Sequence, residues 1–350
     1  MEETGDEDID GADGWIRGFR AIATAESGEQ RFAGAVLVRR GGEMVLADAY
    51  GLADRDQQIP NEVSTRFRNG SLTKMFTAVA VGRLIQAGLV DPAAPVGTYL
   101  TDYPNRDVAT KVTIHHLLTH TGGTGDIFGP EYLERRKQIR AVADYLRLFG
   151  RRGPLFEPGA WFDYSNYGFI LLGAVIEQVS GGSYYDYVDD HVFAPAGMTR
   201  SGALPYDGTV TDLAVGYTAE SGQVAPDTDW LPHRGSPAGG GYTTVEDLWR
   251  FATALTGHRL LDAAHTTLVT TAKLNAGWSG RCVAYGFLDR TVYGIRTLGC
   301  VGGSPGASGE LTIYPDSGHV VAVLANLDPP IASLVSEFIC HRLPVTARAR

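Results

Sequence analysis

The chain has 350 residues, of which 44% are hydrophobic, so it can bury a sizeable core in one large domain or in two interleaved ones. Its formal net charge is −10, but the first 14 residues contribute −7, which leaves −3 for the other 336 residues. The remainder is thus close to neutral, and this excludes a strongly basic nucleic-acid-binding surface. We expect residues 1–14 to form a disordered acidic tail.

We expect no signal peptide, because the first residues are acidic and lack an apolar segment. No run approaches the roughly 18 apolar residues that span a bilayer, so we expect a cytoplasmic protein with no membrane partner. The three cysteines, Cys282, Cys300 and Cys340, have no metal-ligand spacing. We therefore expect no disulfide framework, no metal site and no cofactor.

The first part of the chain predicts a short helix over residues 15–24 and a hairpin of two strands over 32–38 and 44–50, joined at Gly41 and Gly42. Residues 75–90 are apolar nearly all round, which predicts a buried helix. Helical pieces follow up to about residue 235, and we expect them at 113–118, 132–149, 167–179 and 184–193.

The last part of the chain predicts a helix that begins near Thr244, then β-rich runs, then a closing helix over 331–342. The β-rich runs are 285–288, 291–298, 309–314 and 319–325. Strands at both ends with helices between them predict an α+β protein with one sheet built from both termini. We expect 15–90 and 236–350 to form this α/β domain, 91–235 a mostly helical inserted subdomain, and the active site to lie between them.

The first chemical motif is Ser71-Leu72-Thr73-Lys74 at the start of the apolar helix. A Ser and a Lys three residues apart lie on one helix face, so the amine can reach the hydroxyl. Lysine can activate a serine only if its pKa falls, and burial of this helix would lower it. Alone, the pattern also fits a plain helix start.

The second motif is Tyr164-Ser165-Asn166, directly before the helix expected at 167–179. A phenol beside an ammonium loses its proton more easily, and so Tyr164 is a candidate general base or proton relay. The amide of Asn166 can hold an acyl carbonyl or the lysine. The alternative is a helix-entry turn with Asn166 as the cap and Tyr164 in the packing.

The third motif is the glycine-rich stretch 299–306, between two β-rich runs. Glycines such as Gly302 and Gly303 on a strand edge let a ligand approach the backbone. A backbone N–H there, together with that of Ser71, can form an oxyanion hole. A bulge or a wide turn is the alternative.

Together, these motifs resemble the serine β-lactamase/penicillin-binding-protein-like superfamily, and most closely its class C β-lactamase-like esterases, DD-peptidases and transesterases. That family has Ser-x-x-Lys, then Tyr-x-Asn, then Lys/His-x-Gly on a sheet edge. The first two motifs match fully, and the resemblance extends to the segments 117–123, 157–159 and 239–242. It implies a three-layer α/β/α fold with an inserted helical subdomain.

The resemblance also implies a covalent mechanism on a small ester, lactone or amide. Ser71 would attack the carbonyl, Lys74 and Tyr164 would move protons, and Asn166 would orient the acyl group. The backbone N–H groups of Ser71 and Gly303 would form the oxyanion hole. Water or another acceptor would then release the acyl group.

Cys300 departs from the family pattern, because it occupies the position of the third-motif Lys or His. A neutral thiol cannot make the charge-assisted bond to a substrate carboxylate, which is worth about 1.5–3 kcal/mol. The sequence therefore disfavours penicillins and D-Ala-D-Ala carboxylates as substrates. Cys300 itself is not expected to be a nucleophile, since no His is adjacent in sequence and buried strand cysteines are usually inert.

Three aromatic residues, Phe128, Trp230 and Tyr242, are expected to line an acyl pocket, with packing in the core as the alternative. The histidines His115, His116 and His120 are expected to be structural. Cys300 leaves two other functions open: a binding module that has lost acyl transfer, and a biosynthetic tailoring enzyme that moves protons without acylation.

Overall fold

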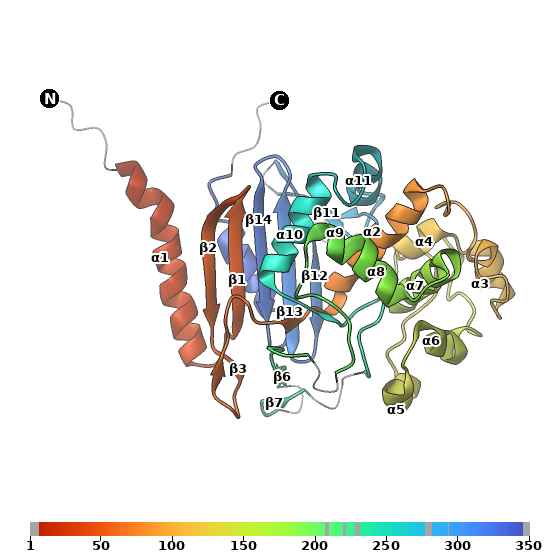
Figure 1. Ribbon diagram of the computed structural model, residues 1–350, viewed down its shortest axis with the longest axis horizontal. Coiled ribbons are helices and arrows are strands. Elements are labelled where there is room, and N and C mark those ends of the chain that lie inside the picture. Colours follow the sequence, from red (N-terminus) through yellow and green to blue (C-terminus); the bar gives the residue numbers. More distant parts are fainter. Residues whose placement is uncertain are drawn as a thin grey trace.

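A computed structural model describes residues 7–206, 210–219, 222–227, 232–276, 282–292 and 294–345. Its centre is an eight-stranded sheet in the order β2-β1-β14-β13-β12-β11-β10-β9, antiparallel throughout (Figure 1). Its strands are β1 (Gly34–Arg40), β2 (Glu43–Tyr50), β9 (Leu274–Asn275), β10 (Cys282–Val283), β11 (Leu288–Val292), β12 (Ile295–Ser304), β13 (Ala307–Tyr314) and β14 (His319–Ala325). Because β1 pairs with β14, the two ends of the chain meet in one sheet, as predicted.

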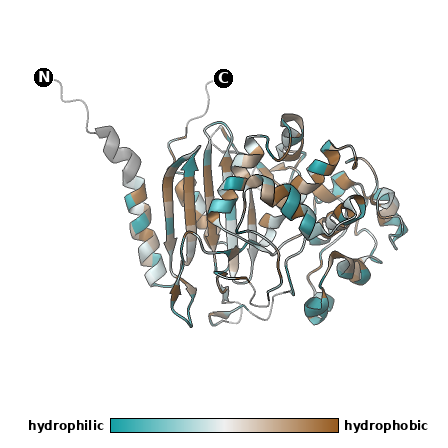
Figure 2. Cartoon of the chain, viewed as in Figure 1, coloured by the Kyte–Doolittle hydropathy of each residue, from teal (hydrophilic) through white to brown (hydrophobic). Residues whose placement is uncertain are grey.

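The sheet has a helical layer on each face, which confirms the three-layer α+β fold. Successive side chains of a strand point to opposite faces, so Val36 packs with α1 (Glu7–Gly28) and α12 (Ile331–Cys340). Leu37, the next residue, belongs to the other core, which α2 (Thr73–Gln86) and α10 (Val245–Thr256) share. The central strands are accordingly hydrophobic along most of their length (Figure 2).

The segment between α2 and β8 (Tyr242–Thr243), which pairs with β5 (Phe67–Arg68), has helices as its main regular elements and packs on α2 from the side away from the sheet (Figure 1). Its main helix α7 (Asn166–Ser180) ends at Gly181, whose φ is +73°. The other helices are α3 (Arg106–Lys111), α4 (Ile114–Leu118), α5 (Pro130–Arg135), α6 (Val142–Phe149), α8 (Tyr184–Val188), α9 (Ala194–Ala196) and, beyond β8, α11 (Ala263–Thr270). Between these helices lie the short turns η2 (Val96–Thr98) and η3 (Arg136–Gln138) and the π-helical η4 (Asp189–Phe193).

The remaining strands form three pairs outside the main sheet. These pairs are β3 (Leu52–Asp54) with β4 (Ile59–Pro60), β5 with β8, and β6 (Tyr217–Thr218) with β7 (Ala225–Pro226).

Local predictions differ from the structure at several points. Helix α1 begins at Glu7, which lies within the segment 1–14 expected to be a disordered tail. The β-rich run expected at 291–298 is divided between β11, which ends at Val292, and β12, which begins at Ile295. The helix expected at 132–149 is broken, because the Asp144 carboxylate accepts hydrogen bonds from the N–H groups of Arg140 and Ala141 and starts α6 there. Residues 285–287 form a bend around Gly286, where φ is +73°, before β11 begins.

The described helices include none that is both long and apolar enough to cross a membrane.

Candidate active site

Ser71 lies in the 3₁₀ turn η1 (Gly70–Leu72), immediately before α2. Gly70 has a φ of +49°, and a Cβ at this position would lie 2.6 Å from the backbone N of Gly303. Glycine is thus required for the close approach of η1 to β12. Lys74 follows on α2, with its Nζ 3.3 Å from Ser71 Oγ. The structure therefore contains the expected contact between amine and hydroxyl.

The Lys74 side chain is only 2% exposed, and the atoms that its amine contacts directly belong to neutral groups. Its Nζ donates to Asn166 Oδ1 at 2.7 Å and to the carbonyl oxygen of Ala238, and it lies 4.8 Å from the centroid of the Tyr164 ring. Burial lowers the pKa of the Lys74 amine to about 7, and the nearby Asp126 carboxylate opposes this shift only in part. A large fraction of the lysine is therefore a neutral base near pH 7.

Tyr164 approaches Ser71 from the loop before α7, and its hydroxyl donates to Ser71 Oγ at 2.8 Å. Its ring stacks on the imidazole of His120, with 4.5 Å between the centroids. Loss of water around the hydroxyl raises the pKa of Tyr164, which is opposite to the direction that we expected from a nearby ammonium. Tyr164 is therefore a protonated phenol in this structure, and Lys74 is the better base.

His120 holds the Tyr164 ring by stacking on it, and its imidazole is uncharged. Its Nδ1 accepts a hydrogen bond from the N–H of Ser165 at 3.1 Å, so this nitrogen carries no proton. Burial also lowers the pKa of His120 to about 3. These contacts agree with the structural role expected for this histidine.

Asn166 is not the cap of α7, because Ser165 occupies that position and its side chain accepts from the N–H of Gly168. The Asn166 amide is thus free to turn into the site, where its oxygen accepts from Lys74. Its Nδ2 donates to both carboxylate oxygens of Asp126, at 3.0 and 3.2 Å. Asp126 therefore fixes which end of the amide faces the lysine. Asp126 was not predicted as a site residue, since one Asp in a loop gives no signal in the sequence.

The third motif forms a strand edge beside Ser71. Strand β11 pairs with β12 only as far as Gly299, and β12 continues to Ser304. Over this extension β12 packs on η1, and a Cβ at Gly302 would lie 2.5 Å from the carbonyl oxygen of Asn69. Glycine is required here too, as the edge would otherwise be pushed away from Ser71.

Cys300 lies on the same edge, and its thiol is 3.7 Å from the carbonyl oxygen of Ser71. Burial raises the pKa of Cys300 to about 11, so the thiol is neutral. The position of the family's cation thus carries no charge, as expected from the sequence.

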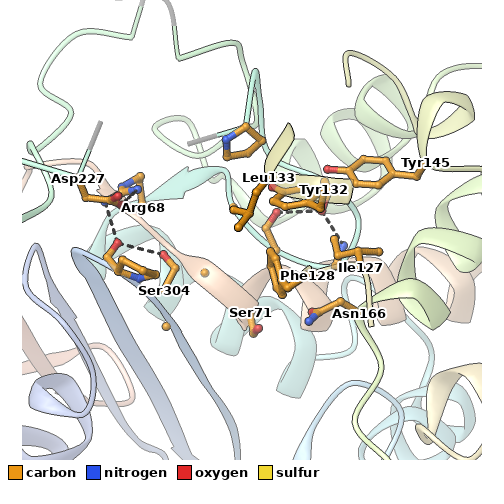
Figure 3. A pocket seen from close by; sticks show the side chains of 18 of the residues that line it. Arg68, Ser71, Ile127, Phe128, Tyr132, Leu133, Tyr145, Asn166, Asp227 and Ser304 are labelled. Carbon is orange, nitrogen blue, oxygen red and sulfur yellow. Dashed lines mark hydrogen bonds and ion pairs between the residues drawn. The ribbon is translucent and has the colours of Figure 1, made fainter. Parts of the chain in front are cut away.

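Ser71 opens into a cavity of about 320 Å³, which we call the Ser71 cavity (Figure 3). Asn166, Gly70 and Gly303 also line it. One end is apolar, and it is lined by Ile127, Phe128, Tyr132, Leu133 and Tyr145. The other end holds Ser304 and the buried ion pair of Arg68 with Asp227, whose atoms are 2.8 Å apart.

The three predicted aromatic positions have different outcomes. Phe128 lines the Ser71 cavity and is 61% exposed at its mouth. Tyr242 does not, because it pairs with Arg68 in the β5–β8 ladder and lines a separate cavity together with Asn69. Trp230 lies outside the described residues. Tyr132 and Tyr145 also line the Ser71 cavity, and neither was predicted because both resemble core residues of a helix.

Within the part of the chain that the structure describes, no group of three or more His, Cys, Asp or Glu side chains is arranged to hold a metal ion.

Comparison with known proteins gives a consistent result. A sequence model of the family described as Beta-lactamase matches residues 14–339. The putative penicillin-binding protein PbpX of Bacillus subtilis (strain 168) is 32% identical over 231 residues, which are 65% of this chain and 56% of that protein. This chain thus aligns with little more than half the length of PbpX.

Two further proteins align with this chain over a larger share of their own length than PbpX does. Esterase EstB of Burkholderia gladioli is 33% identical over 262 residues, covering 65% of this chain and 66% of that protein. The crystal structure of a penicillin-binding protein from Bacillus halodurans has 33% identity and a TM-score of 0.85. That similarity covers 93% of this chain and 99% of the other.

Proposed function

Because the chain belongs to the beta-lactamase family, whose members are serine hydrolases, we propose that it forms an acyl-enzyme at Ser71 and cleaves or transfers a small ester, lactone or amide. One observation carries this proposal. The Oγ of Ser71 lies within 3.3 Å of the Lys74 amine and 2.8 Å of the Tyr164 hydroxyl, at the mouth of a cavity. A serine with a base in hydrogen-bonding range is the arrangement required for nucleophilic catalysis.

In the proposed first step, the neutral fraction of Lys74 takes the proton of Ser71 as Oγ attacks the substrate carbonyl. The negative charge develops on the carbonyl oxygen, and the backbone N–H groups of Ser71 and Gly303 are the proposed donors to it. The approach of Gly70 to Gly303 N supports this assignment, since it brings η1 and β12 together at this point.

In the second step, the C–O or C–N bond of the substrate breaks and the leaving atom takes a proton. Tyr164 is the proposed donor, because its raised pKa keeps the hydroxyl protonated beside Ser71, and the proton that Lys74 took from Ser71 then replaces the one that Tyr164 gives up. Asn166 holds Lys74 and reaches the Ser71 cavity, so it can also contact the acyl group. Water or another acceptor then attacks the acyl-enzyme by the reverse sequence.

The Ser71 cavity supports a small acyl group with an apolar end. Its volume of about 320 Å³ is at the lower limit of pockets that enclose drug-sized ligands. The apolar end next to Phe128 suits an aliphatic or aromatic acyl chain. Hydrogen bonds from two side chains to Ser71 Oγ favour acyl transfer over a binding module that has lost it.

The test is intact-protein mass after a short exposure to p-nitrophenyl acetate or a fluorophosphonate. We expect one adduct on the wild type and on the control Ser304→Ala, whose serine lies in the same cavity, and none on Ser71→Ala. An adduct that persists in Ser71→Ala would refute the assignment of the nucleophile. No adduct on any protein would instead favour the binding module.

A further inference from the structure

A second cavity, of about 370 Å³, lies on the other side of the proposed catalytic residues, and we call it the Cys300 cavity. Lys74, His120, Tyr164 and Cys300 line it, whereas Ser71, Asn166 and Gly303 line the Ser71 cavity. We propose that the Cys300 cavity binds the alcohol or amine part of the substrate, and that this part is uncharged and apolar. The inference rests on the function proposed above and adds the substrate class on the leaving-group side.

The position of Tyr164 assigns the two cavities to the two halves of the substrate. Its side chain lines the Cys300 cavity, and its hydroxyl is 2.8 Å from Ser71 Oγ. A carbonyl attacked by Ser71, with its acyl chain in the Ser71 cavity, directs its leaving oxygen or nitrogen towards the proton on Tyr164. The group attached to that atom then enters the Cys300 cavity.

The lining of the Cys300 cavity is apolar. The described hydrophobic side chains around it are Phe162, Ala276, Val283, Ala284, Phe287, Leu288 and Val301. The thiol of Cys300 is neutral, and the Nδ1 of His120 accepts from the backbone, so neither supplies a charge.

Lys74 is the remaining basic group among the described lining residues, and its N–H groups already have partners. Three acceptors surround Nζ: Ser71 Oγ, Asn166 Oδ1 and the Ala238 carbonyl. A carboxylate in the Cys300 cavity would therefore lose its hydration without gaining a hydrogen bond from Lys74. An uncharged alcohol or amine has no such penalty.

The Cys300 side chain also leaves room for this occupant. A histidine or lysine at the same strand position would extend into the space that the thiol borders, and it would reduce the volume and add charge. Cys300 thus leaves the cavity without a charge at this position.

The same cavity serves acyl transfer. The oxygen of an alcohol in the Cys300 cavity attacks the acyl carbon and forms the new ester bond, and the bond from Ser71 Oγ to that carbon breaks. The alcohol proton passes through Tyr164 and Lys74 to Ser71 Oγ. The products are one ester and the free enzyme, so no other reactant is required.

The first experiment varies the leaving group with the acyl group constant, using benzyl acetate and 4-carboxybenzyl acetate. We expect kcat/KM to be at least about tenfold higher for benzyl acetate, because 4-carboxybenzyl acetate must bury its carboxylate in the cavity. Leu288→Arg, which adds a cation at a partly exposed lining position, should reduce or reverse this preference. Leu288→Met, the size-matched control, should keep it, and Leu133→Arg in the Ser71 cavity should not reverse it.

The second experiment measures how the acetyl-enzyme made from p-nitrophenyl acetate partitions between water and the alcohols methanol to butanol. The ratio comes from one intermediate, so a variant's effect on acylation cancels. We expect the ester-to-acetate ratio to rise by about threefold to fourfold for each added CH₂ and to saturate with alcohol concentration.

The outcomes separate the two proposals. Equal kcat/KM for both benzyl esters in the wild type, or no effect of a folded Leu288→Arg variant, would overturn the inference while leaving the acyl-enzyme intact. A partition ratio that is the same for methanol and butanol would also overturn it. If no Ser71 adduct forms with any ester, the proposed function fails and the inference fails with it.

Discussion

Replacing Lys74 by Met should remove activity and, near neutral pH, stabilise the fold. Lys74 is 2% exposed, and burial lowers the pKa of its amine from 10.5 to about 7. In the unfolded chain the amine returns to its ordinary pKa. At pH 7, folding therefore either removes the proton of the Lys74 amine or buries its positive charge, and both of these oppose folding.

The magnitude follows from linkage. With pKa values of about 7 folded and 10.5 unfolded, the amine opposes folding by about 4 kcal/mol at pH 7 and by about 1 kcal/mol at pH 10. The unfolded state binds more protons in this interval, so wild-type stability rises with pH. Methionine removes this term but leaves Asn166 Oδ1 and the Ala238 carbonyl without their donor, a loss of about 1 kcal/mol each.

We expect the curves of unfolding free energy against pH for the wild type and for Lys74→Met to cross between pH 7 and pH 10. Lys74→Met should be about 1–2 kcal/mol more stable than the wild type at pH 7 and about 1 kcal/mol less stable at pH 10. Urea unfolding between pH 7 and pH 10 measures this difference, and groups common to both proteins cancel. Lys111→Met is the control, because Lys111 is an exposed lysine paired with Asp107, and it should follow the wild type at every pH.

A stability difference between Lys74→Met and the wild type that stays constant from pH 7 to pH 10 would contradict the reasoning. It would mean that Lys74 titrates alike in the folded and unfolded states, and that burial does not prepare it as a base.

Three other variants test the proton path. Tyr164→Phe should slow Ser71 acylation by about 10²–10⁴-fold in a burst assay, and a wild-type burst would exclude Tyr164 as a proton donor. Asp126→Asn removes a carboxylate that raises the pKa of Lys74, so the rising limb of the acylation pH profile near pH 7 should move to lower pH; an unmoved limb would contradict this. Cys300→His should raise kcat/KM about tenfold for esters with a carboxylate in the leaving group, and no gain would refute the role given to position 300.

Much of the fold follows from the hydrophobic pattern along the chain. The short, continuous apolar runs in 32–38 and 319–325 predict strands, and these are the neighbours β1 and β14. The errors arose where one side chain redirects the backbone. Asp144 starts a new helix within a continuous amphipathic pattern, and Gly286 bends a β-rich run so that it packs on α2. Such effects depend on single contacts, and composition averages over them.

The motif residues of the site were predictable because each lies at a fixed offset in the sequence. Ser71 and Lys74 share one helix face, and Asn166 stands one residue after the cap of α7. Asp126 was not predictable, because its partner Asn166 is 40 residues away and no local pattern joins them. The Tyr164 pKa was predicted in the wrong direction, since the sequence shows the nearby lysine but not the loss of water around the hydroxyl.

The origin of the Lys74 pKa explains how a proposed hydrolase can function without the third-motif cation. Burial is the largest cause of its fall to about 7, and no cation is among the causes. A charged residue at position 300 would lower that pKa further, but the base already titrates near neutral pH without it. Cys300 can therefore change substrate recognition while the proposed Ser71–Lys74 chemistry remains. This separation favours an enzyme with an altered leaving-group side over a site that has lost acyl transfer.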